Sequence, residues 1–112
     1  MIRIGVRSDA QGRIRYLSCS GHARFDHEGG TDIVCAGVSA LTGALIIGLT
    51  QVIGVPVSYE RASGVTKIRV PARLPEVESG QVQVLMKTTV RALEELAQHY
   101  EGFLRVRWLR PL

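Results

Sequence analysis

Apolar and polar residues alternate at both ends of the chain, which is typical of β-strands with one buried face. The alternation covers Ile2 to Val6, and a second run rich in β-branched and aromatic residues covers Ile14 to Cys19. Between them, Asp9 to Gly12 has the composition of a turn, so the two runs predict a hairpin. Apolar residues alternate with arginines over 104–108, which predicts a last strand with a buried face that includes Trp108 and a basic face.

The middle of the chain contains a second hairpin pattern and a helical pattern. Two apolar runs, Val55–Tyr59 and Val65–Val70, flank the polar segment Glu60–Gly64, which predicts two strands joined by a loop. Between Val77 and Tyr100 the apolar residues recur every three or four positions, as in an amphipathic helix. With a further helix after residue 32, the order is ββαββαβ, and we expect an α+β domain whose mostly antiparallel sheet packs with two helices.

The segment from Ile33 to Tyr59 contains no charged residue and is long enough to span a membrane. It also contains glycines, polar side chains and Pro56, so its helical part should be nearer twenty residues. We expect a buried core helix and no membrane association. The glycines at 37, 43 and 48 should allow close approach of a neighbouring backbone, within the chain or across a homodimer.

Composition is that of one packed globular domain over residues 1–112, with 46% apolar and 21% charged residues. The formal net charge is +4, and twelve of the fourteen cations are arginines spread along the chain. The chain has two cysteines, and its first residues have no signal-peptide pattern, so we expect a reducing, cytoplasmic location. No metal-ligand spacing and no phosphate-binding glycine motif occurs, and we expect neither a metal nor a cofactor.

The candidate chemistry lies where the long apolar helix begins. Asp32, or Thr31 beside it, is a suitable N-cap, which places Cys35 in the first helical turn, where the helix dipole favours the thiolate. The backbone N–H groups of Val34 to Ala36 are candidates to bind an oxyanion. A buried, unreactive Cys35 is the alternative, since cysteine is commonly a small core residue.

Two histidines are candidate bases for such a thiol. His22 follows the second strand and His27 lies in the next loop, and residue types alone do not decide between them. Cys19, inside a strand, is interpreted as structural, and His99 as a partner of a helix C-terminus. The loop between the second strand and the apolar helix consists of Arg24, Phe25, Asp26, His27, Glu28, Gly29, Gly30 and Thr31. We expect this loop to be exposed and to act as a lid.

Two clusters, Gly21-His22-Ala23 and Asp32-Ile33-Val34-Cys35-Ala36, the second followed by Val38-Ser39, closely resemble the signature of the ribosomal-processing cysteine protease (Prp) family. This resemblance implies His22 as catalytic base, Cys35 as nucleophile, and Asp32 and Ser39 as supporting residues. It implies removal of the N-terminal extension of a large-subunit ribosomal protein, the twenty-seventh, with no nucleic acid required. The loop between His22 and Cys35 departs from the family pattern: it is one residue longer, with Phe25-Asp26 in place of a Tyr-Gly.

A second hypothesis is a non-catalytic ribosome- or RNA-associated module that uses its basic strand faces. Its phosphate contacts would come from Arg13, Arg15, Arg105, Arg107 and Arg110. The aromatic content of 5% argues against it, because Tyr16, Phe103 and Trp108 are few and are expected to be buried.

Overall fold

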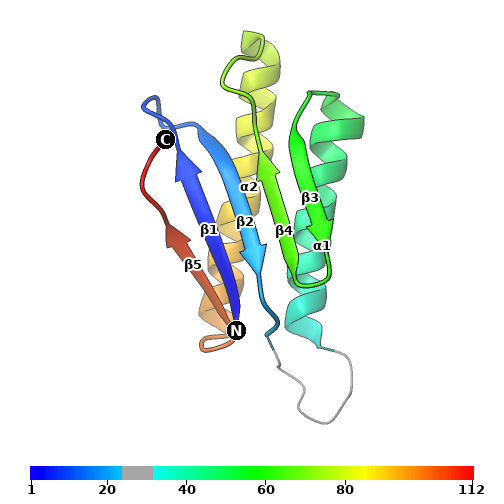
Figure 1. Ribbon diagram of the computed structural model, residues 1–112, viewed down its shortest axis with the longest axis vertical. Helices are drawn as coiled ribbons and strands as arrows, with labels where there is room; N and C mark the ends of the chain where they lie inside the picture. The colour runs from blue at the N-terminus through cyan, green and yellow to red at the C-terminus, as the bar shows by residue number, and fades with distance from the viewer. Residues whose placement is uncertain (24–31) are drawn as a thin grey trace.

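The computed structural model describes residues 1–23 and 32–112. A five-stranded sheet has the order β3-β4-β2-β1-β5, and all neighbouring strands are antiparallel except β1 and β5, which are parallel (Figure 1). The elements are β1 (Ile2–Ser8), β2 (Ile14–Ser20), α1 (Ile33–Ile47), the π-helical turn η1 (Gly48–Ile53), β3 (Ser58–Ala62), β4 (Val65–Arg69), α2 (Glu76–His99) and β5 (Leu104–Trp108). The predicted ββαββαβ order and α+β class are confirmed.

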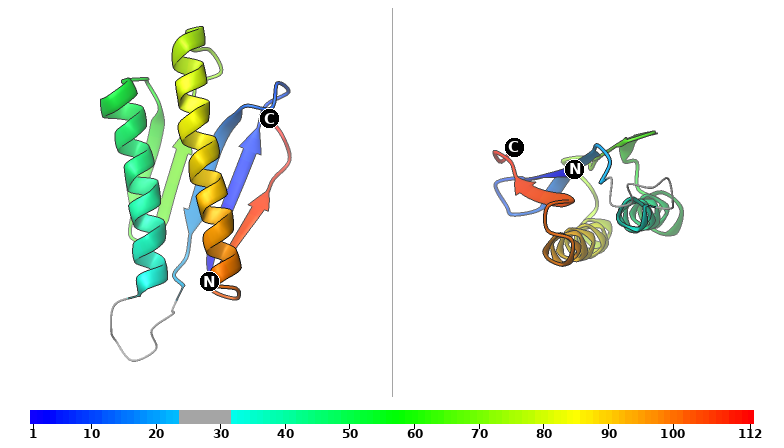
Figure 2. Two further views of the ribbon diagram at one scale, coloured as in Figure 1. Left: turned by 180° about the vertical axis from the view of Figure 1, so that it is seen from behind. Right: turned by 90° about the horizontal axis from the view of Figure 1, so that it is seen from below.

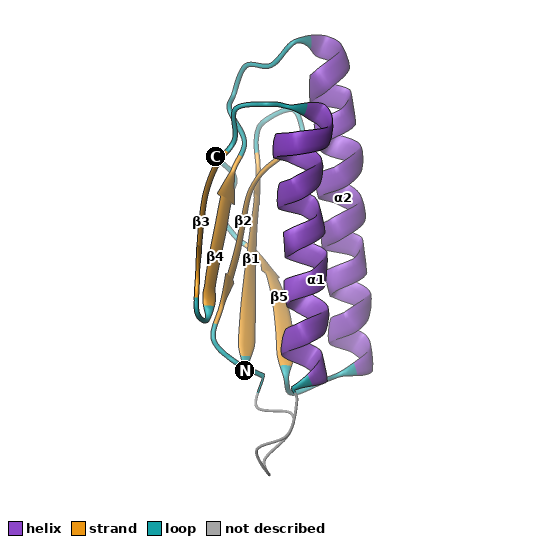
Figure 3. Cartoon of the chain, turned by 90° about the vertical axis from the view of Figure 1, so that its right-hand side faces the viewer, coloured by secondary structure: helices purple, strands orange, loops and turns teal. Residues whose placement is uncertain are grey.

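The two helices form one layer against one face of the sheet (Figures 2 and 3). The core lies between the layers, because the inward residues of β1, β2 and β4 meet the apolar sides of the helices. Its fully buried members include Ile4, Val6, Leu17 and Ile68 from the sheet, and Val34, Leu49, Val82, Met86 and Leu93 from the helices. Among the described residues no helix or strand covers the opposite face of the sheet.

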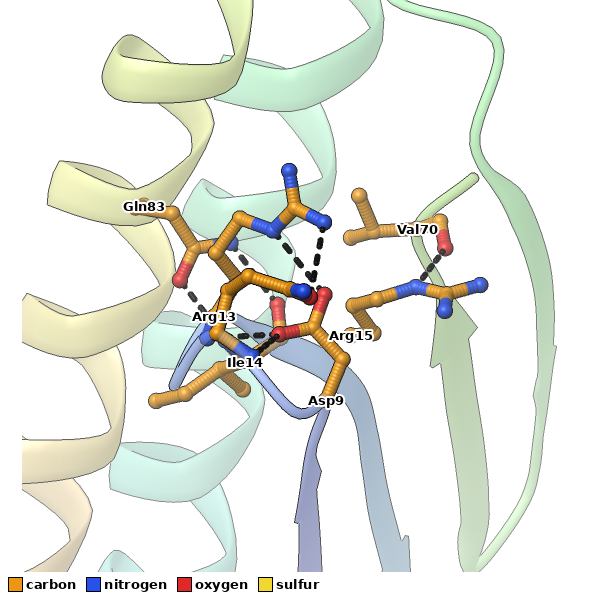
Figure 4. A network of polar contacts seen from close by, with 7 residues as sticks. Asp9, Arg13, Ile14, Arg15, Val70 and Gln83 are labelled. Atoms are coloured by element: carbon orange, nitrogen blue, oxygen red, sulfur yellow. Dashed lines mark hydrogen bonds and ion pairs between the residues drawn. The ribbon is translucent and has the colours of Figure 1, made fainter. Parts of the chain in front are cut away.

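The turn between β1 and β2 is held by Asp9, as Figure 4 shows. The Asp9 carboxylate accepts hydrogen bonds from the backbone N–H groups of Gln11 and Arg13 and from Arg13 Nε, at 2.9 to 3.0 Å. Burial by itself would raise the pKa of the Asp9 carboxyl, but these hydrogen bonds outweigh burial and lower its pKa. The amide of Gln83 pairs with both backbone groups of Ile14, which ties the turn to α2.

The apolar helix confirms the expected length of about twenty residues, since α1 and η1 together run from Ile33 to Ile53. This stretch is long and apolar enough to cross a membrane, yet it contributes Val34, Val38, Leu45 and Leu49 to the core. The stretch ends at Gly54, which has φ of +81° and whose N–H bonds the Leu49 carbonyl. It therefore packs as the core helix of this domain.

The helix glycines make close contacts inside the chain. A Cβ at Gly48 would lie 2.8 Å from Leu85 Cδ1 of α2, so the missing side chain lets the two helices approach. A Cβ at Gly43 would lie 3.0 Å from the Arg61 guanidinium of β3. The close contacts at these two positions are thus with side chains of α2 and β3, and not with the neighbouring backbone that the sequence predicts.

Two expectations were wrong in detail. The first strand of the second hairpin is Ser58–Ala62, not Val55–Tyr59, and a two-residue turn follows it. The strand starts late because the N–H of Val55 donates to the Leu49 carbonyl at the end of the helix. Trp108 was expected in the core but is half exposed, with its indole N–H donating to Glu94 at 3.3 Å. It is the last residue of the edge strand β5, which has a neighbouring strand on one side only.

Candidate active site

Asp32 organises the first turn of α1. Its Oδ1 accepts from the backbone N–H groups of Val34 at 3.0 Å and Cys35 at 3.1 Å, while its backbone carbonyl accepts from the N–H of Ala36. The predicted N-cap is therefore Asp32, with an extended backbone. The amides of Val34 and Ala36 are already used in these bonds, so the helix start offers no uncommitted N–H at the two positions assigned to an oxyanion.

The side chain of Cys35 donates one hydrogen bond and accepts another. Its thiol donates to Asp32 Oδ2 at 3.2 Å, and its Sγ accepts from the backbone N–H of Ala23 at 3.3 Å. Ala23 follows β2, so the end of a central strand and the start of α1 meet at the sulfur. A hydrogen bond from the thiol to a carboxylate stabilises the protonated sulfur, whereas the N–H of Ala23 would also stabilise a thiolate.

His22 precedes Ala23 in the chain, and it lines the same cleft as Cys35. Its ring packs on Gly64 in the turn between β3 and β4, where an added Cβ would be 2.9 Å from Nε2. Gly64 has φ of +74°, a second reason for glycine there. The His22 carbonyl accepts from the N-terminal ammonium at 2.6 Å, and the Gly21 N–H donates to the Gly64 carbonyl at 2.9 Å, so the backbone around the ring is fixed on both sides.

A cleft of about 290 Å³ brings three of the sequence-predicted residues together, since His22, Cys35 and Ser39 all line it. Ser39 is one helical turn after Cys35, and its carbonyl accepts from Arg61 Nη2 at 3.0 Å. Asp32 does not line the cleft, but its carboxylate accepts the hydrogen bond from the Cys35 thiol. Most of the remaining lining comes from the end of β2 and from the β3–β4 hairpin, and the rest is Ile2 of β1 with Val38 and Thr42 of α1.

Cys19 also lines the cleft but is nearly fully buried. Burial raises the pKa of its thiol to about 11, and the nearby Arg61 lowers it only in part. The thiol therefore stays protonated near neutral pH, in agreement with its interpretation as structural. His99 is in the last turn of α2, where its ring contacts the Glu95 carbonyl.

Sequence reasoning missed the Ala23 N–H as a partner of Cys35, and it missed Gly64 and Arg61 as residues that line the cleft. Ala23 was visible only as a member of the Gly-His-Ala cluster, and Arg61 and Gly64 are brought in by strand pairing that local patterns do not specify. The candidate lid, Arg24 to Thr31, and the alternative base His27 lie outside the described residues. Within residues 1–23 and 32–112, no group of three His, Cys, Asp or Glu side chains is arranged to hold a metal ion.

Cysteine hydrolases pair a cysteine, often at a helix N-terminus, with a histidine, and the arrangement of Cys35 and His22 in one cleft fits this class. Residues 1–105 match the family model of the cysteine protease Prp. The chain belongs to this family and is a cysteine protease. It is 30% identical over 112 residues to the ribosomal processing cysteine protease Prp of Staphylococcus aureus (strain Mu50 / ATCC 700699), covering 96% of this chain and 99% of that one.

Solved structures share the whole fold. The essential ribosomal processing protease Prp from S. aureus with a covalently linked product peptide has a TM-score of 0.85 at 22% identity, covering 97% of this chain and 100% of that one. The S. aureus protease with a substrate peptide has a TM-score of 0.80 at 19% identity, with the same coverage. SMU.848 from Streptococcus mutans has a TM-score of 0.77 at 25% identity, covering 98% of this chain and 95% of that one.

Proposed function

We propose that this protease removes the N-terminal extension of a large-subunit ribosomal protein, the twenty-seventh, using Cys35 as nucleophile and His22 as general base and acid. The main support is that His22 and Cys35 line one cleft. The N–H of Ala23, the residue after His22, also donates to Cys35 Sγ. The processing role follows the name of the 30% identical S. aureus relative.

The proposed reaction has two steps. His22 takes the thiol proton while Sγ attacks the scissile carbonyl carbon; the tetrahedral intermediate then collapses, the C–N bond breaks, and His22 returns the proton to the leaving amine. Water next attacks the thioester with His22 as base, which releases the carboxylic acid of the extension and restores the thiol. No cofactor, metal or nucleic acid enters either step.

The Ala23 N–H is our proposed donor to the oxyanion. It is directed at Sγ from 3.3 Å, so the carbonyl oxygen of a carbon bonded to Sγ would come within its reach. The N–H groups of Val34 and Ala36 could bind the oxyanion only after breaking their hydrogen bonds to the oxygens of Asp32. One such donor is worth about 2.7–4 kcal/mol of transition-state stabilisation in a well-studied protease.

Asp32 and Ser39 support the site in this proposal. Asp32 fixes the backbone of Cys35 and holds its proton when no substrate is bound, so that the carboxylate and His22 compete for that proton. Ser39 lies along the cleft one turn further, where an extended peptide would pass.

We also propose a homodimer in the cytoplasm. Exposed apolar side chains on α1 and η1, including Ile33, Ile47 and Val52, support a second copy packing there. Two reduced cysteines, one of them the nucleophile, suit a reducing compartment.

The test of the substrate assignment uses the host's own ribosomal protein carrying its N-terminal extension. Incubation with the purified protease should give one new N-terminus at the extension boundary, read as a mass difference. An unprocessed substrate with an enzyme that cleaves other peptides would contradict the substrate but not the protease class.

A further inference from the structure

The uncovered face of the sheet is strongly basic. Alternation along β1, β2, β4 and β5 directs the core residues to the helices, so the intervening residues share the opposite face (Figure 3). That face carries six cations, Arg3, Arg7, Lys67, Arg69, Arg105 and Arg107. Its one acidic residue on the described strands is Glu60, opposite Lys67. We call these six residues the basic face.

We propose that the basic face binds the phosphate backbone of RNA, with little preference for base sequence. This inference is independent of the substrate assigned above, because it concerns the opposite side of the sheet from Cys35 and α1. It also replaces the non-catalytic form of the RNA hypothesis, since the chain is an enzyme.

The described residues provide no carboxylate partner for the cations of the basic face, although Arg7 Nη1 donates to the Arg110 carbonyl at 3.2 Å. The ion pairs within residues 1–23 and 32–112 are Arg13–Asp9 and Arg91–Glu94, and neither includes a basic-face residue. Register places Arg3 directly beside Arg105, and neighbouring strands are about 4.8 Å apart, so their charges repel each other unless an anion lies between them. A bound phosphate chain would relieve this repulsion.

An aromatic ring lies among these charges. Tyr16 is opposite Arg7 and Arg69 on the neighbouring strands, with their guanidinium carbons 5.9 and 5.2 Å from its ring centroid. Planar guanidinium and phenol groups offer stacking surfaces to an unpaired base. One half-exposed ring is too few for reading a base sequence, so backbone contacts should dominate.

The surface is shaped by the chain after β5. Leu109 lies across Gly5, where an added Cβ would be 2.8 Å from Leu109 Cδ1. Two hollows flank Leu109, one of about 210 Å³ with Arg3, Arg105 and Arg107, the other of about 410 Å³ with Arg7, Tyr16 and Arg69. Cations therefore line concave sites on both sides of one apolar ridge, which suits a chain of phosphates more than a flat protein surface.

A second copy of this chain is a poor occupant. A symmetric pair would place six cations against six cations without matching acids, which costs free energy through like-charge repulsion. The exposed apolar residues of α1 and η1 lie in the helix layer, away from this face. An acidic protein is the remaining competitor, and the experiment separates it from RNA.

The test measures fluorescence anisotropy of a labelled RNA hairpin as a function of salt. The variant Arg69→Gln/Arg105→Gln/Arg107→Gln should bind at least tenfold more weakly, and its salt slope should fall by about two to three. The matched control Arg73→Gln/Lys87→Gln/Arg91→Gln removes the same charge from exposed sites outside the basic face and should retain most of the affinity. Both variants should keep wild-type peptide cleavage and melting temperature, which shows that the fold is intact.

Three results would overturn the proposal. The first is no RNA binding by the wild-type protein at low salt. The second is an equal loss of affinity in both variants, which would indicate net charge alone. The third is displacement of the RNA by polyglutamate as effectively as by unlabelled RNA, which would assign the face to an acidic protein.

Discussion

The backbone N–H of Ala23 donates to the Sγ of Cys35 across 3.3 Å, and this bond joins the end of β2 to the first turn of α1. Because His22 precedes Ala23, this bond also fixes the position of the His22 backbone relative to the Cys35 thiol. The imidazole ring packs against Gly64 in the turn of the β3–β4 hairpin. Base and nucleophile are thus placed by three separate segments of chain.

Removing either member of the proposed dyad should abolish cleavage. Cys35→Ala and Cys35→Ser should each lose more than about 10³-fold in kcat/KM, because neither side chain forms a thiolate-like nucleophile, and His22→Ala should lose activity for want of a base. His99→Ala serves as the control, since that ring contacts the Glu95 carbonyl of its own helix, does not line the cleft, and should keep full activity. Cleavage of a fluorogenic peptide measures all four, and substantial turnover by Cys35→Ser would remove Cys35 from the mechanism.

Gly64→Ala should impair catalysis more than stability. A Cβ at Gly64 would press on the imidazole of His22, and a displaced base can cost on the order of 10²-fold in kcat. The matched control is Gly12→Ala, which has a similar φ of +77° but no atom within 4 Å of an added Cβ. Both variants should lose about 1 kcal/mol of unfolding free energy from backbone strain, and only Gly64→Ala should lose activity. Equal kcat values for the two would show that the His22 position tolerates this contact.

Replacements of Asp32 should separate its two roles. Asp32→Asn keeps an oxygen for the N–H groups of Val34 and Cys35, so stability should be nearly unchanged, whereas Asp32→Ala should lose about 1 kcal/mol. The asparagine removes the negative charge that holds the thiol proton, so Cys35 should react faster with iodoacetamide at fixed pH. A slower reaction would mean that the carboxylate promotes ionisation of the thiol instead.

The predictable and unpredictable parts of this site differ in physical origin. The N-cap, the helix start and the strand periodicity depend on neighbours within a few residues, so Asp32, Cys35 and the element order could be predicted from local patterns. The contact of His22 with Gly64 depends on the antiparallel pairing of β2 with β4, which joins residues 45 to 53 positions apart. Neither that contact nor the bond from Arg61 to Ser39 has a local signal.

The same limit explains the misplaced strand and the misjudged Trp108. Val55 and Val57 have high strand propensity, but the N–H of Val55 donates to the Leu49 carbonyl at the end of the helix. This N–H therefore cannot pair with a neighbouring strand. The alternation over 104–108 specified the correct face for Trp108, toward α2, yet not how far α2 extends over the sheet edge. The period-2 pattern predicts the face of the sheet on which a side chain lies, whereas the burial of that side chain depends on the element that packs against the face.

The two cysteines should differ sharply in reactivity. Burial raises the pKa of Cys19 to about 11, so in the folded protein at pH 7.5 iodoacetamide should modify Cys35 and leave Cys19 intact. In a denaturant both should be modified, because the thiol of Cys19 then returns to its ordinary pKa of 9.0. Peptide mass mapping distinguishes the two sites, and native modification of Cys19 at a similar rate would contradict the burial argument.

Asp9 should make stability depend on pH in the acid range. Its hydrogen bonds from Arg13 and Gln11 lower its pKa in the folded state below the ordinary value of 3.8. A group with a lowered folded-state pKa stabilises the fold fully above its unfolded pKa, and this contribution is lost as the pH falls through the folded-state pKa. Asp9→Asn should therefore lower the free energy of unfolding by about 1 kcal/mol at pH 7, because Arg13 loses its charged partner at a partly exposed site.

The difference between wild-type protein and Asp9→Asn should shrink as the pH is lowered below 3.8, and urea denaturation at pH 7, 5 and 3 would measure it. The control is Arg91→Gln, which breaks a more exposed ion pair with Glu94 at 3.5 Å and should change stability little at any of these pH values. A constant Asp9→Asn difference from pH 7 to pH 3 would show that the turn depends on the hydrogen-bond geometry of residue 9 and not on its charge. A difference that grows toward pH 3 would reverse the sign of the linkage, and with it the conclusion that hydrogen bonding outweighs burial at Asp9.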